Sequence, residues 1–251
     1  MNKPAIWTIP IIALALALVV PTAACAQGQG QNQGVTQQQA EEMLKELRAI
    51  RQALERVSPP PGQPAPERTA TLNDLTGPVM GRPDAPLTLV EFTDLQCPYC
   101  NRFTTTTFEQ LKAAYIDTGK VRFVSRDFPL DSHPQAIPAA KASRCAGEQG
   151  KFWEMRLALV RNATRLSPAL ITSTAEGLKL DMPAFAACTA SPRYDADIKR
   201  DMDVALKAGI EGTPSFVLGR TTATGVEGVL VVGAQPFQVF DAKIKQLLGA
   251  R

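Results

Sequence analysis

The chain has 251 residues, of which 45% are hydrophobic and 20% are charged, and its formal net charge is +3. This length and apolar content suffice for one full-sized hydrophobic core, so we expect one globular domain with appended segments. A charge this small, spread evenly along the sequence, argues against a nucleic-acid partner or an anionic membrane surface.

The first 26 residues have the pattern of an export signal. Lys3 precedes the apolar run 11–20, and small residues follow it. The run is short for a membrane span, and Ala24-Cys25-Ala26 has the form of a cleavage site, so we expect a mature chain that starts at Gln27. The protein would then be periplasmic or otherwise extracytoplasmic. The alternative is a lipoprotein anchored at Cys25, since Ala23-Ala24-Cys25 fits a lipobox.

A polar spacer and a helix follow. Residues 27–36 are of low complexity, which predicts a flexible spacer. Thr36 and Gln39 have the capping-box spacing that begins a helix. Beyond them, apolar residues recur at intervals of four and three, as in a coiled-coil seam: Met43, Leu47, Ile50, Leu54 and Val57. We therefore expect an amphipathic helix over residues 37–57.

Residues 58–71 are rich in proline, which predicts a stiff, extended linker. A helix held away from the rest of the chain would leave its apolar stripe in water unless it met a partner. We therefore favour a homo-oligomer formed through residues 37–57. The alternative is an amphipathic helix that lies on its own globular domain.

The globular domain is expected over residues 72–251. The apolar run 87–93 predicts a strand and residues 101–118 predict a helix, with Cys97-Pro98-Tyr99-Cys100 between them. A cysteine at a helix N-terminus faces unpaired N–H groups and the positive end of the macrodipole, which favour a thiolate. In such motifs the cysteine pKa falls to roughly 3.5–7.5. Cys97 and Cys100 are therefore the candidate catalytic residues of a redox-active dithiol.

Three other interpretations of this motif are weaker. A zinc site would need two further ligands, but the chain has one histidine, His133, and no second closely spaced cysteine pair. A structural disulfide across two residues gains little from loop closure. A cysteine hydrolase would need a base beside the thiol, and nothing in the sequence places His133 there. We interpret His133 as a loop or cap residue.

Glu91 interrupts the predicted strand before the cysteine motif. It is either an edge or face residue of the sheet, or a desolvated carboxyl group beneath the dithiol. In the second case its pKa would be raised and it could exchange a proton with Cys100.

The rest of the chain predicts a sheet with a helical insertion. Strands are expected at 121–125, 214–218 and 228–232, a final helix at 236–248, and a block of helices at about 132–208. Turn and proline signals mark the expected helix starts at Ser132, Ser167, Asp181 and Ser191. The order of elements predicts an α/β fold with a mixed sheet covered by helices. Cys145 and Cys188 lie in the block, as buried free cysteines or, in an exported protein, as a structural disulfide.

Four segments resemble the DsbA-like thiol:disulfide oxidoreductases of the thioredoxin superfamily. They are residues 91–100, Arg126-Asp127-Phe128-Pro129-Leu130 with His133-Pro134, residues 145–153, and residues 209–214. The likeness covers about residues 72–249. The N-terminal helix lies outside it and is similar to the oligomerising helix of trimeric DsbA-like isomerases.

The resemblance implies a thioredoxin fold with a cis peptide bond at Thr213-Pro214. The loop around that bond would lie against the dithiol, and Thr213 would offer its backbone to an extended substrate segment. Pro98 and Tyr99 would shape the reduction potential and the contact surface, and Cys145 would pair with Cys188. The implied partners are exported cysteine-containing proteins and a membrane or periplasmic redox partner. No cofactor and no metal are expected.

We therefore expect an exported enzyme that forms or exchanges disulfides in extracytoplasmic proteins. The direction stays open, because an oligomeric helix would suit a disulfide isomerase or reductase. A binding protein of another class, a non-catalytic chaperone or a copper-binding module with two thiolate ligands, is a further alternative.

Overall fold

The computed structural model describes residues 35–57 and 67–249. The chain divides into two compact units, Met1–Ala65 and Pro66–Arg251, which we treat separately. The predicted signal with Cys25, most of the spacer and residues 58–66 of the linker lie outside the described residues. None of the described helices is long and apolar enough to span a membrane.

The first unit contains helix α1 (Gln37–Val57), with the predicted bounds. The capping box forms, because the Thr36 N–H donates to Gln39 Oε1 at 3.0 Å and the Gln39 N–H donates to Thr36 Oγ1 at 3.2 Å. Within this unit the apolar stripe is more than half exposed at Met43, Leu47, Ile50 and Leu54.

The second unit is built on a six-stranded mixed sheet of order β1-β6-β5-β3-β4-β2. The strands are β1 (Thr69–Leu72), β2 (Val79–Met80), β3 (Leu87–Thr93), β4 (Val121–Asp127), β5 (Ser215–Thr221) and β6 (Val226–Val232). Central β3 pairs parallel to β4 and antiparallel to β5, and all seven of its residues are buried. Such burial on both faces explains its continuous apolar sequence.

Two edge strands differ from the sequence-based expectation. Strand β1 begins at Thr69, inside the segment expected to be linker, because its alternating side chains bury Ala70 and Leu72 against the sheet. Strand β2 has only two residues, which is too short for a periodic sequence pattern. It lies between Gly77 and Gly81, and both glycines have a positive φ.

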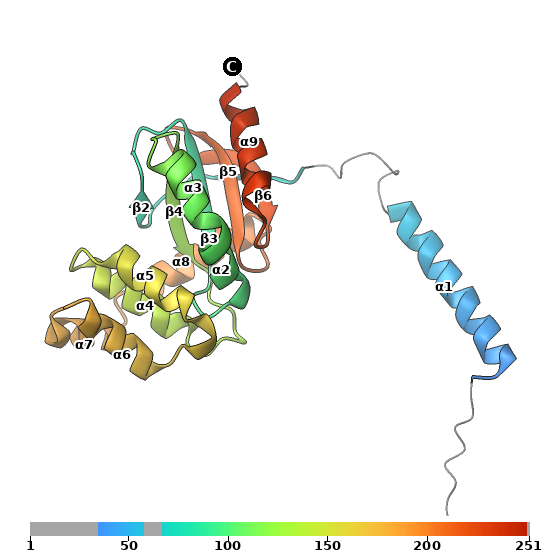
Figure 1. Ribbon diagram of the computed structural model, residues 1–251, viewed down its shortest axis with the longest axis horizontal. Coiled ribbons are helices and arrows are strands. Elements are labelled where there is room, and N and C mark those ends of the chain that lie inside the picture. Colours follow the sequence, from blue (N-terminus) through green and yellow to red (C-terminus); the bar gives the residue numbers. More distant parts are fainter. Residues whose placement is uncertain (1–34, 58–66, 250–251) are drawn as a thin grey trace, which may run out of the picture. The chain divides into compact units, whose positions relative to one another are not determined.

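Helices cover both faces of the sheet and extend beyond it (Figure 1). The helical segments are α2 (Pro98–Phe103), η1 (Thr104–Phe108), α3 (Glu109–Leu111), η2 (Lys112–Ile116), α4 (Ala136–Gly147), α5 (Phe152–Arg161), η3 (Ala163–Arg165), α6 (Pro168–Gly177), α7 (Met182–Ala190), α8 (Asp195–Lys207) and α9 (Phe237–Gly249). The run from α2 to η2 packs with α9 on one face, and α8 packs on the other.

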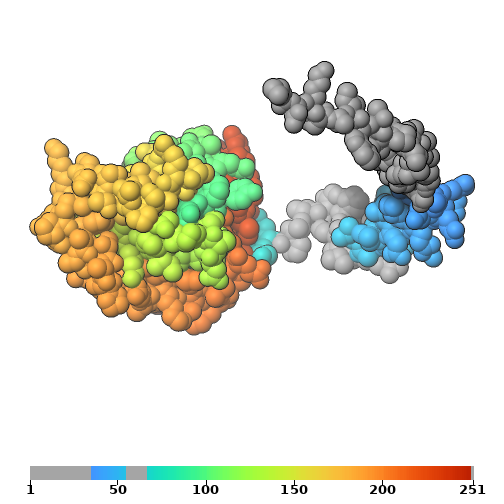
Figure 2. All heavy atoms as spheres, turned by 90° about the horizontal axis from the view of Figure 1, so that it is seen from below, coloured from blue at the N-terminus to red at the C-terminus, as the bar shows by residue number. Residues whose placement is uncertain are grey.

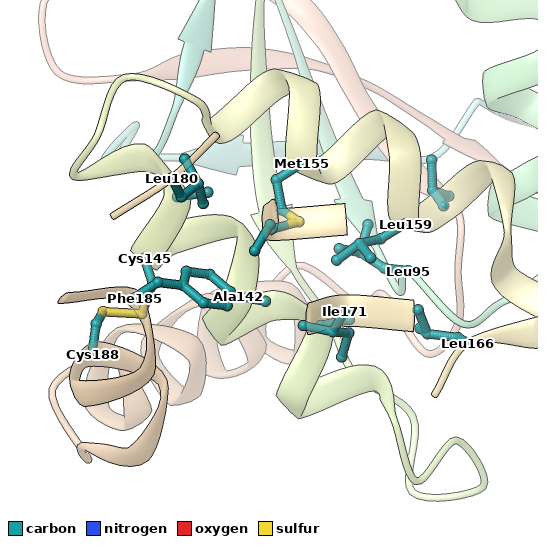
Figure 3. Close-up of a cluster of buried hydrophobic side chains, with 14 of the residues drawn as sticks. Leu95, Ala142, Cys145, Met155, Leu159, Leu166, Ile171, Leu180, Phe185 and Cys188 are labelled. Atoms are coloured by element: carbon teal, nitrogen blue, oxygen red, sulfur yellow. A yellow bond between two sulfur atoms is a disulfide. The ribbon is translucent and has the colours of Figure 1, made fainter. Parts of the chain in front are cut away.

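The inserted helices form a bundle with its own core (Figure 3). This core contains Met155 and Leu159 of α5 and extends to Leu95, in the turn after β3, and a disulfide of 1.96 Å joins Cys145 of α4 to Cys188 of α7. Closing that loop of 43 residues stabilises the fold by about 4 kcal/mol in the chain-entropy model. In the view of Figure 2 these helices, coloured yellow-green to orange, form much of the surface of the second unit.

Candidate active site

A buried carboxylate shapes the turn that leads from β3 to the cysteine motif. Asp94 accepts the backbone N–H of Gln96 at 2.7 Å and that of Leu130 at 2.9 Å, and one of its oxygens lies 2.7 Å from His133 Nδ1. The Cys97 N–H closes the turn on the Asp94 carbonyl at 3.1 Å. His133 is thus a loop residue that braces Asp94, and this role of Asp94 was missed from sequence.

Cys97 is the N-cap residue of α2, with φ −72° and ψ 125°. Pro98 follows at the first helical position, where its missing N–H has no cost. The pKa of Cys97 is lowered to about 5, mainly by a hydrogen bond with Cys100 and further by Thr213 and the backbone N–H groups of Cys100 and Tyr99, although burial opposes this. Cys97 therefore carries a thiolate at neutral pH.

Cys100 has the opposite character. Its side chain is fully buried in the first turn of α2, and burial, the Cys97 sulfur and the Glu91 charge raise its pKa well above that of a free thiol. Neither cysteine is joined in a disulfide here. The pair thus joins a good nucleophile and leaving group to a thiol that must lose a proton before it reacts.

The loop before β5 lies against this dithiol. The Thr213-Pro214 peptide bond is cis, as the resemblance implies, and the Cys97 sulfur lies 3.5 Å from the Thr213 carbonyl oxygen. The Gly233 N–H donates to the Pro214 carbonyl at 2.8 Å and fixes the loop to the segment after β6. Beside Cys97, the Tyr99 side chain is 60% exposed. The loop and Tyr99 thus flank the nucleophile.

Glu91 is a buried core residue of β3 rather than an edge residue. Burial raises its pKa, and the Arg156 charge opposes the rise. Its Oε2 forms an ion pair with Arg156 of α5, which was missed from sequence. Arg156 lies among the apolar positions Met155, Leu159 and Val160 of its helix, and that charge on a buried face is the signal that could have revealed it.

The described residues offer little to a metal ion. In segments 35–57 and 67–249 no three His, Cys, Asp or Glu side chains are grouped so that they could hold one. The two sulfurs of Cys97 and Cys100 are therefore the ligands that this site could present to a soft ion.

Comparison with known proteins identifies the fold family. The family model described as Thioredoxin matches residues 73–227. Similar solved structures include α-DsbA1 of Wolbachia pipientis (27% identity, TM-score 0.63, 70% of this chain and 96% of that one) and a thioredoxin-like oxidoreductase from Silicibacter pomeroyi DSS-3 (28% identity, TM-score 0.58, 71% and 96%). DsbA2 of Pseudomonas aeruginosa is 26% identical, with TM-score 0.56 and 75% and 98% coverage.

The curated relatives have a different description. The chain is 36% identical over 163 residues to the Na⁺/H⁺ antiporter NhaA 3 of Salinispora tropica, a match that covers 64% of this chain and 24% of the antiporter. The chain thus spans at most about a quarter of the length of these curated relatives.

The expected thioredoxin-like α/β fold with a helical insertion is confirmed by the sheet order, by the inserted bundle and by these comparisons. Together they show that the chain belongs to the thioredoxin family and is a DsbA-like member of it.

Proposed function

We propose that this chain is an exported thiol:disulfide oxidoreductase that forms or exchanges disulfides in extracytoplasmic proteins through Cys97 and Cys100. The observation that carries the proposal is the contrast between the two thiols. One has a pKa of about 5 at the start of α2, and the other is buried with a raised pKa. The DsbA-like neighbours support oxidoreductase chemistry for such a pair.

In the oxidised enzyme, a substrate thiolate attacks the Cys97 sulfur and Cys100 leaves, which gives a mixed disulfide. A second substrate thiolate then attacks the substrate sulfur of that disulfide and Cys97 leaves as a stable thiolate. The substrate gains one disulfide, and the enzyme gains two electrons as a dithiol. Glu91 exchanges the proton of Cys100, and a redox partner in the membrane or periplasm must reoxidise the pair.

The surface around Cys97 suits an extended polypeptide substrate. The cis-proline loop places the Thr213 backbone beside the nucleophile, where strand-like pairing can align a cysteine-containing segment. Pro98 and the exposed Tyr99 ring would complete the contact surface.

Cysteine substitutions test this mechanism. Cys97→Ser should abolish turnover in insulin reduction and in oxidative refolding of a reduced protein, because the attacking sulfur is lost. Cys100→Ser should accumulate mixed disulfides with client proteins, because nothing inside the enzyme resolves them. A Cys97→Ser variant with full activity would refute the assignment. A wild-type chain that binds clients or copper without catalysis would favour the chaperone or copper-binding alternative.

The oligomeric isomerase or reductase is the second candidate, favoured by the exposed apolar stripe of α1. A homo-oligomer through residues 37–57 would hold several dithiols together, an arrangement usual for disulfide isomerases. A redox titration of the Cys97/Cys100 pair in glutathione buffers distinguishes an oxidase from a reductase. An oxidising potential favours an oxidase, and a strongly reducing one favours a reductase.

Export is part of the same proposal and is supported by the signal-like residues 1–26. Mass spectrometry of the mature N-terminus tests it. A chain that starts at Gln27 supports a free extracytoplasmic protein, an acylated Cys25 supports the lipoprotein alternative, and an intact N-terminus on a cytosolic chain contradicts both.

A further inference from the structure

A buried arginine of the inserted bundle reaches the centre of the thioredoxin sheet. Arg156 of α5 has a side chain that is 1% exposed, and it forms an ion pair with Glu91, whose side chain is fully buried. Its Nε donates to Ser125 Oγ at 2.9 Å. Ser125 lies directly opposite Glu91 in the β3–β4 register. Arg156 therefore links α5 to two neighbouring central strands.

Aromatic rings hold the guanidinium group in this place. Its central carbon lies 5.9 Å from the ring centre of Phe123 on β4 and 5.8 Å from that of Trp153, one turn earlier on α5. A guanidinium group beside ring faces gains cation–π attraction, and more so when it is desolvated. Its position is thus fixed by an ion pair, a hydrogen bond and two rings.

The two carboxylate oxygens of Glu91 have different surroundings. Oε2 pairs with Arg156, whereas the buried Oε1 has no hydrogen-bond partner among the described residues. A buried carboxylate oxygen without a donor is costly, and it is a ready acceptor for a proton. Cys100 is the thiol whose pKa the Glu91 charge helps to raise, so it keeps the proton that must be removed.

We propose that Arg156 is a positioning residue for the dithiol: its pairing with Oε2 favours the ionised form of Glu91 and leaves Oε1 to accept the Cys100 proton. The proposal deepens the proposed function and rests on it. The inserted bundle then does more than enlarge the fold, because it supplies the positive charge on which proton transfer beneath the dithiol depends.

In the step that resolves a mixed disulfide, Glu91 Oε1 takes the proton of the Cys100 thiol. The Cys100 sulfur bonds to the Cys97 sulfur, the bond between Cys97 and the client sulfur breaks, and the client leaves as a thiolate. The client sulfur is reduced, and the two enzyme cysteines are oxidised to a disulfide. The reverse step returns the proton to Cys100.

Loss of the arginine charge should protonate Glu91. Arg156 from α5, Thr93 on β3 and Cys100 from α2 interact with this carboxyl, and Ser125 lies opposite it on β4. Arg156 is the positive charge among them, and an opposite charge at contact lowers a carboxyl pKa by about 1–3 units. Without it, burial shifts Glu91 further toward its neutral form, and Cys100 loses its base.

The aromatic disulfide DTNB separates the two cysteines in one stopped-flow trace of the reduced full chain. The first nitrobenzoate thiolate reports attack by Cys97, and the second reports attack by Cys100 on the mixed disulfide. In Arg156→Met, we expect the pH midpoint of the second phase to rise by about 1–2 units while the first phase stays within twofold. Arg156→Lys keeps the charge and should keep the wild-type midpoint.

Two further variants separate this role from a structural one. Arg126→Met removes another buried guanidinium group. Arg126 follows Ser125 on β4, so its side chain points to the opposite face of the sheet, where it pairs with Asp201 of α8. The substitution should lower stability without moving the second phase. Glu91→Gln and the double variant Glu91→Gln/Arg156→Met should have the same profile, because Arg156 acts through Glu91.

The proposal is overturned if Arg156→Met keeps the wild-type midpoint, if Arg126→Met moves the midpoint as far, or if loss of Arg156 still changes the profile in the Glu91→Gln background. If Arg156→Met does not fold, a ¹³C NMR titration of the wild-type Glu91 carboxyl decides, since a group protonated at pH 7 refutes the role. A wild-type chain with these DTNB profiles and no catalysis on insulin refutes the proposed function alone.

Discussion

At the scale of single residues, the pKa values of two neighbouring thiols are shifted in opposite directions because their surroundings differ. Cys97 ends the turn held by Asp94, and Cys100, Thr213 and the N–H groups of the first turn of α2 lower its pKa. Cys100 is one turn further on, where it is fully buried. The cysteine spacing and the strand-to-helix pattern were enough to predict the first position. The buried ion pair of Glu91 with Arg156 was not predictable in full, because it joins residues 65 positions apart.

The low pKa of Cys97 gives a pH-dependence that can be measured. The alkylation rate of Cys97 by iodoacetamide should rise with a midpoint near pH 5. Since the hydrogen bond with Cys100 is the largest cause of the shift, Cys100→Ala should move this midpoint toward that of a free thiol by at least one unit.

The same shift affects the stability of the dithiol form. A pKa that is lower in the folded chain than in the unfolded chain stabilises the fold above the unfolded value, and the stabilisation is lost as the pH falls through the folded value. For Cys97 this window runs from about pH 9 down to about pH 5. An alkylation midpoint above pH 8 in the wild-type chain would contradict both expectations.

At the scale of elements, the predicted helix starts show which local sequence signals are enough to locate the N-terminus of a helix. Ser167 and Asp181 cap α6 and α7, because their side chains accept the N–H groups of Leu170 and Ala184. Ser132 and Ser191 do not cap helices, since α4 begins at Ala136 and α8 begins at Asp195. A cap that bonds to its own helix is readable from sequence, whereas a start set by packing on another element is not.

A cluster of charged side chains connects α8 to β4 and α4, and it allows a prediction about stability. Asp201 accepts hydrogen bonds from Arg126 Nε at 2.9 Å and Arg144 Nη2 at 2.6 Å. Burial, and then the charge of Asp127, nonetheless raise its pKa to about 6. A carboxyl whose pKa is raised in the folded chain binds more protons there than in the unfolded chain, so the contribution of Asp201 to stability rises as the pH falls from about 6 toward 4.

Urea unfolding of the oxidised chain measures this rise. Two pKa units correspond to about 3 kcal/mol, and Asp201→Asn should remove that part of the increase. The pKa of Asp74 is lowered to about 2, so its own contribution changes below that window and does not mask the effect. This account would be contradicted if the free energy of unfolding of Asp201→Asn changed between pH 6 and 4 as it does in the wild-type chain.

At the scale of the whole molecule, the chain joins a catalytic unit to a helix that has no core of its own. The buried clusters of the second unit surround its sheet and fill its inserted bundle. In the first unit, the described helix α1 exposes more than half of Met43, Leu47, Ile50 and Leu54. An isolated helix of this length is marginal in water, so burial of the stripe against other copies would account for its heptad spacing.

This association can be tested with one substitution in the seam and one outside it. Leu47→Glu puts a charge at the centre of the stripe and should convert a light-scattering mass of several chains into that of one chain. Gln52→Glu adds the same charge at the outermost heptad position, so it should leave the mass unchanged. Each monomer should keep its DTNB reactivity, because Cys97 and Cys100 belong to the other unit. In Leu47→Glu, the rate of isomerisation of a scrambled substrate should fall together with the measured mass. If the wild-type chain is already a monomer at micromolar concentration, the proposed oligomer is wrong and the structural reason for an isomerase is lost.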